Sequence, residues 1–161
     1  MANPNIDPIY SKSGEISWNS TSALFTAAMT AGNVSSFDGT DANIKLIWTA
    51  DATNGGYLDH VRARCCSLSG ASAASVLRLF VNNGSTPATA ANNVLFDELG
   101  LPATTNTIVA ATAPQILVFK IMYPIGYRLY GGLGTAVTTG WAVSAVSGKY
   151  YCPTVSTFLL I

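Results

Sequence analysis

The chain has 161 residues, of which only 10% are charged, and its eight basic and eight acidic side chains give a formal net charge of zero. Ordinary soluble domains carry about 25% charged residues. Neutrality excludes the basic footprint of a nucleic-acid-binding protein, and polar residues interrupt every uncharged stretch before it reaches the run of about 20 apolar residues that spans a membrane. Because so few charges oppose association, we expect much of the surface to contact other protein.

Residues 1–14 are expected to form an extended arm. They contain Asn and Pro where a secretory signal needs a basic and then an apolar stretch, so the sequence favours synthesis in a cytoplasm. The arm is too polar to pack in a core, and we expect it to lie along a neighbouring subunit. The residues expected to make these contacts are Asn3, Pro4, Ile6, Pro8 and Tyr10.

Residues 15–161 are expected to form one domain made of strands, because apolar side chains alternate with period two along most of it. In chain order, the predicted strands are Glu15–Trp18, Ile44–Thr49, His60–Cys65, Val76–Val81, Val94–Leu99, Gln115–Tyr123, Gly126–Tyr130, Trp141–Ser147 and Val155–Ile161. Clusters of turn-forming residues predict turns at 51–56, 82–87, 101–106 and 131–134. Trp48 is expected to continue the face of Ile44 and Leu46.

Two interpretations remain open for Ser20–Ala31. Its apolar residues share one face of a helix that Gly32 could cap, whereas Ala23–Thr26 also fits a strand, which we favour.

Short strands at this spacing, with no secure helix between them, predict an all-β antiparallel sandwich or barrel. Of the two we favour a sandwich of about eight strands. Several strands are apolar on both faces, as in Ile116–Tyr123, where only Lys120 is charged. In a two-sheet sandwich the outer face of each strand should meet water. We therefore expect either a loop or another subunit to cover it.

The three cysteines do not predict a disulfide framework. Cys65 and Cys66 are adjacent, so on a strand their side chains point to opposite faces, and Cys152 lies far away in sequence. We expect free, buried thiols in a reducing cytoplasm, because the spacings do not fit a zinc site.

A catalytic site is not expected. His60 is the only histidine, and Asp59 beside it on a strand should face the other way, so no Ser-His-Asp arrangement is built locally. Asp97 and Glu98 should also alternate faces, which gives no support for paired acid–base carboxylates.

Cofactor and metal sites are not expected either. The acidic segment Asp38–Asp41 lacks the further ligands of a calcium loop. The segment Gly131–Gly134 lacks the Lys-Ser or Lys-Thr that follows a phosphate-binding loop, so we interpret it as a turn.

An ordered series of motifs in the middle of the chain resembles the structural proteins of tailed bacteriophages. In those proteins a Val-Asp-type strand, a small-residue turn, a Val-Arg-Leu-Phe strand, a glycine turn and an acidic strand follow one another. The corresponding segments are Leu58–Arg64, Gly70–Ala74, Ser75–Gly84 and Leu95–Leu99, followed by Tyr123–Leu129 and Trp141–Tyr150. The resemblance covers about two thirds of the chain, from Trp48 to Tyr150, whereas Tyr123–Ile125 and the residues after Tyr150 depart from the pattern.

This resemblance implies a non-enzymatic virion protein with a jelly-roll-like fold, most of all a capsid decoration, or cement, protein. Such a protein is made in the host cytoplasm and sits on the outer capsid surface. Its partner is the major capsid protein of a tailed phage, and lattice symmetry favours a homodimer or homotrimer. No cofactor, membrane or nucleic acid is implied as a partner.

The alternative is a tail- or fibre-associated sandwich that binds a host receptor or carbohydrate. Exposed aromatic rings suit sugar stacking, and Trp18, Trp48 and Trp141 are candidates, although we expect most of the aromatic residues in core or interface positions. Tyr150 and Tyr151 are expected to be partly exposed and to contribute to interaction.

Overall fold

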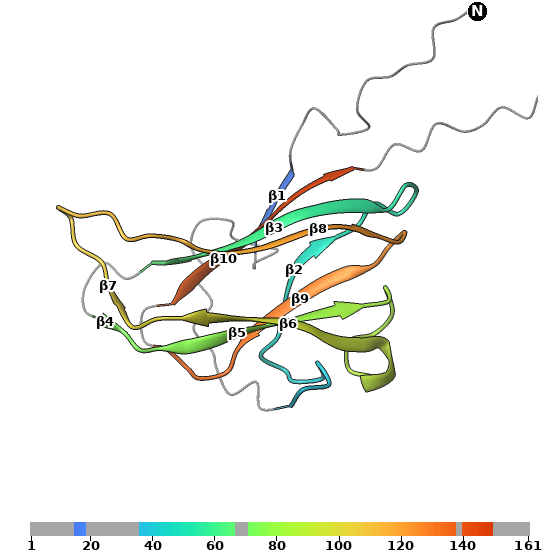
Figure 1. The fold of residues 1–161 in the computed structure, drawn as a ribbon. Helices are drawn as coiled ribbons and strands as arrows, with labels where there is room; N and C mark the ends of the chain where they lie inside the picture. Colours follow the sequence, from blue (N-terminus) through green and yellow to red (C-terminus); the bar gives the residue numbers. More distant parts are fainter. Residues whose placement is uncertain (1–14, 19–35, 67–70, 138–139, 150–161) are drawn as a thin grey trace, which may run out of the picture.

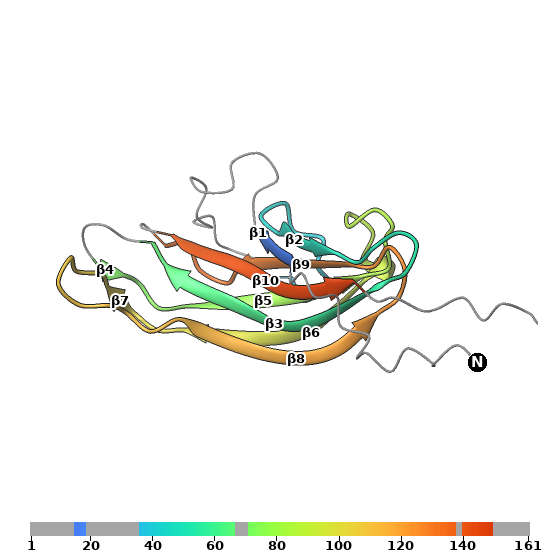
Figure 2. The ribbon, with the colours of Figure 1, turned by 90° about the horizontal axis from the view of Figure 1, so that it is seen from above.

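The computed structural model describes residues 15–18, 36–66, 71–137 and 140–149. Within these ranges the chain forms an antiparallel β-sandwich of two four-stranded sheets (Figures 1 and 2), so the predicted all-β sandwich is confirmed. The first sheet contains, in spatial order, β1 (Glu15–Trp18), β10 (Trp141–Lys149), β3 (Gly56–Cys65) and β8 (Gln115–Tyr123). The second contains β2 (Lys45–Thr49), β9 (Arg128–Leu133), β5 (Ser75–Asn82) and β6 (Asn93–Leu101).

Short elements complete the described part of the chain. At one end of the sandwich, β4 (Ala71–Ser72) pairs with β7 (Thr104–Thr105). A single turn of 3-10 helix, Ala90–Asn92, precedes β6.

The alternating pattern located most strands correctly. Strands β1 and β8 have the predicted bounds, and β2, β3, β5, β6 and β10 overlap the predicted ranges. Two further predictions, the strand at Val155–Ile161 and the helix-or-strand segment Ser20–Ala31, lie outside the described residues.

The turn predicted at 131–134 is wrong, because β9 continues to Leu133. Gly131 is buried in the middle of the second sheet, and a Cβ atom there would lie 2.6 Å from Cδ1 of Ile47 and 3.2 Å from Cδ2 of Leu79. The position needs glycine because the side chains of the neighbouring strands leave no space for a Cβ atom, and not because the chain turns there.

Trp48 does not share the face of Ile44 and Leu46, as the alternation had predicted. The register between β2 and β9 shifts after Leu46, so Ile47 is the extra residue of a β-bulge. Ile47 and Trp48 both enter the main core, whereas Ile44 and Leu46 pack on the opposite face of the sheet.

The main core fills the space between the two sheets. Its fully buried side chains include Leu58, Val61, Leu77, Leu79, Leu129, Leu133, Trp141 and Val143.

A second, smaller cluster lies on the outer face of the second sheet, around the buried rings of Phe80 and Tyr130. The loop before β2 covers this cluster, and Gly39 lies so close that a Cβ atom there would be 3.0 Å from the Phe80 ring. A loop of the chain thus covers an outer face here, which was one of the two expected solutions. On β8, in contrast, Ile116, Val118 and Met122 remain about half exposed.

Both described cysteines are free thiols, but only one is buried. Cys65 is the last residue of β3, and its side chain packs in the main core. Cys66 follows the end of the strand and is exposed, so the predicted burial is wrong for this residue. Cys152 lies outside the described residues.

Candidate protein-binding surface

The expected separation of Asp59 and His60 is wrong. Nδ1 of His60 lies 2.6 Å from Oδ2 of Asp59. The register of β3 shifts between Leu58 and His60 against both β8 and β10, and this bulge breaks the alternation on which the prediction depended. A carboxylate bound to Nδ1 orients an imidazole in the way a catalytic base requires.

The two residues directly opposite His60 in the first sheet supply no third catalytic group. They are Val146 on β10 and Val118 on β8, which carry no nucleophile. Asp59 and His60 form a partly exposed ion pair or hydrogen bond on the outer face of the first sheet.

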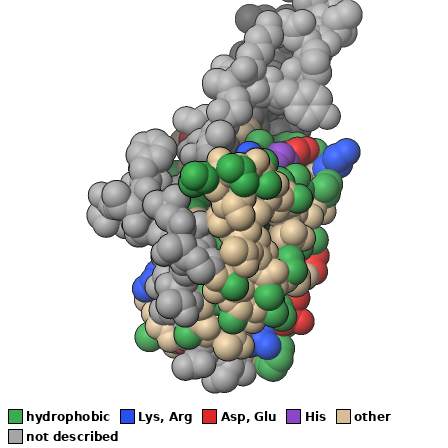
Figure 3. All heavy atoms as spheres, turned by 90° about the vertical axis from the view of Figure 1, so that its left-hand side faces the viewer, with side chains coloured by type: hydrophobic (Ala, Val, Ile, Leu, Met, Phe, Trp, Pro, Cys, Tyr) green, Lys and Arg blue, Asp and Glu red, His purple; other side chains and the backbone are tan. Residues whose placement is uncertain are grey.

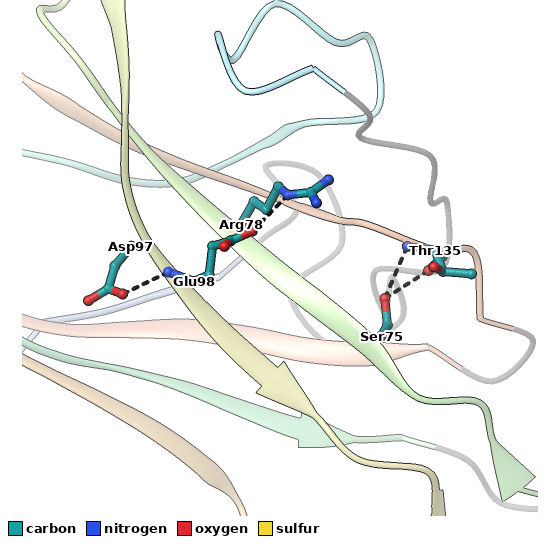
Figure 4. Close-up of polar contacts among 5 residues, drawn as sticks. All are labelled: Ser75, Arg78, Asp97, Glu98 and Thr135. Carbon is teal, nitrogen blue, oxygen red and sulfur yellow. Dashed lines mark hydrogen bonds and ion pairs between the residues drawn. The ribbon is translucent and has the colours of Figure 1, made fainter.

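The carboxylates on β6 take part in separate local contacts (Figure 4). Glu98 accepts a hydrogen bond from Nε of Arg78 at 2.9 Å, and Oδ1 of Asp97 accepts one from the backbone N–H of Glu98 at 2.7 Å. Arg78 also lies over the ring of Phe37, with 4.4 Å between its guanidinium carbon and the ring centroid. The bond between Arg78 and Glu98 links β5 to β6 within the second sheet.

The acidic segment 38–41 is a loop held by its own hydrogen bonds. Oδ1 of Asp38 accepts hydrogen bonds from the backbone N–H and the hydroxyl of Thr40, at 3.1 and 2.8 Å, and these lower the pKa of the carboxyl group. Across the described residues no three His, Cys, Asp or Glu side chains are grouped so that they could hold a metal ion. Within the same ranges no helix has the length and apolar character to cross a membrane.

The most distinctive surface is one end of the sandwich, which we call the uncharged end. It consists of residues 71–74, which include β4, residues 102–114, which include β7, and residues 134–137. None of these residues is charged. Figure 3 looks onto this end. Hydrophobic and other uncharged side chains occupy the centre of the coloured surface, and charged side chains lie toward its margins.

The fold brings three uncharged stretches of sequence together at this end. Register pairs Cys65 with Trp141, Ser75 with Leu101, and Leu77 with Leu133, so the loops that join these strands all project in the same direction. Stretches that are far apart in the sequence thus form one surface.

Hydrogen bonds hold the loops of the uncharged end in place. Nδ2 of Asn106 donates to the carbonyl oxygen of Cys65 at 2.9 Å, and the hydroxyl of Thr112 donates to Oδ1 of Asn106 at 2.9 Å. The hydroxyl of Ser75 donates to the carbonyl oxygen of Thr135 at 3.0 Å and accepts from its N–H at 3.2 Å (Figure 4). Loops held in this way lose little conformational entropy on binding, so a preformed surface of this kind favours association.

Two large apolar side chains lie at the tip of the uncharged end. Ile108 is 100% exposed and Val109 is 87% exposed. Contiguous exposed apolar side chains can mark a protein contact, and this adjacent pair on an uncharged surface is a candidate for one. The sequence offered a signal for them, because they are the only large aliphatic pair in the Ala- and Thr-rich segment 102–114.

A second apolar surface lies along one side of the sandwich, where the edge strands β6 and β8 run next to each other (Figure 2). The rings of Phe96 and Phe119 stack across this side, with 5.4 Å between their centroids. We call this side the β6–β8 edge. The exposed apolar residues of its two strands point in different directions: Val94 and Phe96 of β6 lie on the inner side, whereas Ile116, Val118 and Met122 of β8 lie on the outer face of the first sheet.

The interaction residues predicted from the sequence fall outside the described ranges. These residues are Asn3, Pro4, Ile6, Pro8, Tyr10, Tyr150 and Tyr151. Trp48 and Trp141 are both buried, as expected for core residues, so neither presents a stacking surface. The structure therefore points to surfaces that the sequence-based choice of residues did not include.

Comparison with protein-family models, with curated proteins and with solved structures finds no match for this chain. The resemblance to bacteriophage structural proteins therefore stays a prediction, and any functional assignment depends on the surfaces described above.

Proposed function

We propose that this protein is a non-enzymatic assembly protein, a capsid decoration protein that binds the outer shell of a tailed bacteriophage through its uncharged end. The observation that carries the proposal is the exposure of Ile108 and Val109 at the tip of an ordered surface without charge. Association of such a surface with protein removes apolar area from water and separates no charged group from solvent.

The strand order supports the jelly-roll-like winding that the resemblance implies. Each sheet pairs an early strand with a late one, β1 with β10 and β2 with β9, as expected when a long hairpin is wound into two facing sheets. The connecting loops of such a sandwich gather at its two ends, which is how an end becomes a binding surface.

Decoration also fits a contact made through a single loop tip with one exposed aliphatic pair. A protein that binds many equivalent places on an assembled shell stabilises the shell by preferring it to the separate subunits. When its copies also contact one another, modest individual affinities are sufficient.

The proposal is tested by sedimenting purified protein with expanded, undecorated shells of a phage that encodes it and counting bound copies per shell. We expect saturation at a number that matches the lattice symmetry. Absence of binding to shells, together with binding to glycans or host cells, would instead support the tail- or fibre-associated alternative.

A further inference from the structure

The outer face of the first sheet carries a group of basic side chains. On β3, Val61 and Ala63 are fully buried in the core, so Arg62 and Arg64, which alternate with them, point outward and are exposed. Lys120 is exposed on the same face of the neighbouring strand β8 (Figure 2). Since alternate residues of a strand are about 7 Å apart, the two arginines form a regularly spaced pair of charges.

These three cations lack an acidic partner among the described side chains. The ion pairs seen in this part of the chain join Asp59 to His60 and Arg78 to Glu98, and neither pair includes one of the three. Asp59 is the only acidic residue among the described side chains of β3, β8 and β10, and its carboxylate already lies 2.6 Å from Nδ1 of His60. The face therefore has a positive charge, although the chain is neutral overall.

The backbone at Lys120 indicates that its side chain does more than stabilise the strand. Lys120 has a φ of 52°, in the left-handed region, and it lies where the register between β3 and β8 shifts. No other described residue except glycine has a positive φ. Glycine adopts this conformation with less strain than lysine does. Strained backbone of this kind clusters at binding sites and other functional positions.

Apolar side chains lie beside the cations. On β8 the same outer face presents Ile116, Val118 and Met122, each about half exposed. Register places Ile116 directly opposite Arg62. We call these three side chains together with Arg62, Arg64 and Lys120 the basic face, which combines a charged row on β3 with an apolar row on β8.

We propose that the basic face binds an acidic β-strand surface of a partner protein, with carboxylates at every second residue lying against Arg62 and Arg64. A partner strand presents alternate side chains at the same spacing of about 7 Å, so each arginine can meet one carboxylate. Arginine binds a carboxylate through two parallel hydrogen bonds. Apolar side chains of the partner cover the row on β8, and Lys120 binds a further carboxylate.

Other occupants match the basic face less well. A second copy docked through the same face would place like charges together, which opposes association. Single-stranded nucleic acid also seeks cations, but its binding sites supply aromatic rings on which bases stack. The exposed large apolar side chains of the basic face are aliphatic instead.

The inference goes beyond the proposed function, because the uncharged end and the basic face are different surfaces. A chain with both surfaces can link two protein partners. The two proposals are tested with different probes, shells for one and a peptide for the other, so each can fail alone.

The experiment is titration of the full chain with a short synthetic peptide in which glutamate alternates with valine. We expect saturable binding that weakens when the ionic strength is raised from about 0.01 M to about 0.15 M, because salt screens exposed charges. Arg62→Glu should weaken binding about fivefold or more, because it places like charges together. Lys45→Glu, the same reversal on the second sheet, should bind like the wild type.

Lys120→Gly separates a binding role from a structural one. Glycine relieves the strained backbone, so the variant should melt no lower than the wild type and yet bind the peptide more weakly. A lower melting temperature with unchanged peptide binding would overturn the role given to Lys120.

Circular dichroism establishes that each variant is folded. Absence of peptide binding at low ionic strength would overturn the inference, and so would equal binding by Arg62→Glu and Lys45→Glu. An oligothymidine titrated in parallel should bind more weakly than the peptide. Tighter binding of the oligothymidine would overturn the choice of a protein partner.

Discussion

At the residue scale, Gly56 and Trp48 form a tight contact at the start of β3. A Cβ atom on Gly56 would lie 2.6 and 2.7 Å from two carbons of the buried Trp48 ring. That ring also packs edge-on against Tyr123, with 5.3 Å between the ring centroids. The indole therefore has little room to move away from an added methyl group.

Gly56→Ala is expected to lower the free energy of unfolding by about 1–3 kcal/mol, because overpacking a rigid ring forces strain into the core. Denaturant unfolding measures this change. Gly100→Ala on β6 is the matched control, since nothing lies within 4 Å of its Cβ position, and it should be neutral or slightly stabilising. Equal effects of the two substitutions would contradict the account of the Trp48 contact.

Tyr123→Phe is expected to raise the free energy of unfolding at neutral pH by about 1 kcal/mol. The Tyr123 hydroxyl is buried and has no hydrogen-bond partner among the described residues, so its removal relieves a desolvation cost while the ring contact with Trp48 remains. The measurement is chemical denaturation at pH 7. A variant less stable than the wild type would show that the Tyr123 hydroxyl forms a hydrogen bond in solution.

The same residue predicts a change of stability at high pH. Burial raises the pKa of Tyr123 above its ordinary value of 10.0, so the folded state keeps a proton that the unfolded state releases. Ionisation of Tyr123 in the unfolded state therefore takes away no stability below about pH 10, and the free energy of unfolding falls as pH rises beyond that value. Wild-type protein should therefore lose more stability between about pH 9 and 11 than Tyr123→Phe, and parallel losses would reject this cause.

At the element scale, a pair of amides, the fully buried Asn82 and the half-buried Asn93, fixes the hairpin of β5 and β6. Nδ2 of Asn82 donates to Oδ1 of Asn93 at 2.8 Å, and Oδ1 of Asn82 accepts from the N–H of Gly84 at 2.9 Å. Nδ2 of Asn93 donates to the carbonyl oxygen of Pro87 at 2.7 Å. Since Asn82 is fully buried, these bonds are shielded from competing water.

Asn82→Ala is expected to lower the free energy of unfolding by about 1–3 kcal/mol, because it leaves the Asn93 oxygen and the Gly84 N–H without their partner. Asn83→Ala removes an exposed neighbouring amide whose bonds to Asn92 and to the N–H of Ser85 can be replaced by water, so it should change stability by less than about 0.5 kcal/mol. Thermal and denaturant unfolding compare the two. A hairpin equally tolerant of both changes would show that the amide pair contributes little.

Alternation of side chains predicts where strands lie but not where they bulge. Most strands were located by this pattern, yet Asp59 and Ile47 each sit at a register shift and reverse the expected faces of their neighbours. A bulge depends on partner strands that are distant in sequence, so local alternation carries no signal for it. The wrong turn prediction at 131–134 has the same cause. Gly131 is required by the side chains of Ile47 and Leu79, which lie on neighbouring strands and are distant in sequence.

At the scale of the whole molecule, the low charge of the chain can be read from the sequence. The position of the uncharged surface on the folded protein cannot. Uncharged stretches become one surface only when the sheet topology brings their loops to the same end. The sequence placed the contacts in residues 1–14 and at Tyr150 and Tyr151, outside the described ranges. The pair Ile108 and Val109 stands out in the sequence as the large aliphatic pair of segment 102–114, but its exposure at the tip of this end is known only from the structure.

The most direct test of the binding surface is quantitative sedimentation of a double variant, Ile108→Asp with Val109→Asp, with undecorated shells. Both side chains project into solvent, so the fold should be retained, and placing charge at the contact should reduce binding about tenfold or more. Ala88→Asp, on an exposed loop at the opposite end, should bind like the wild type. Full binding by the double variant would contradict the assignment of the uncharged end as the surface that meets the shell.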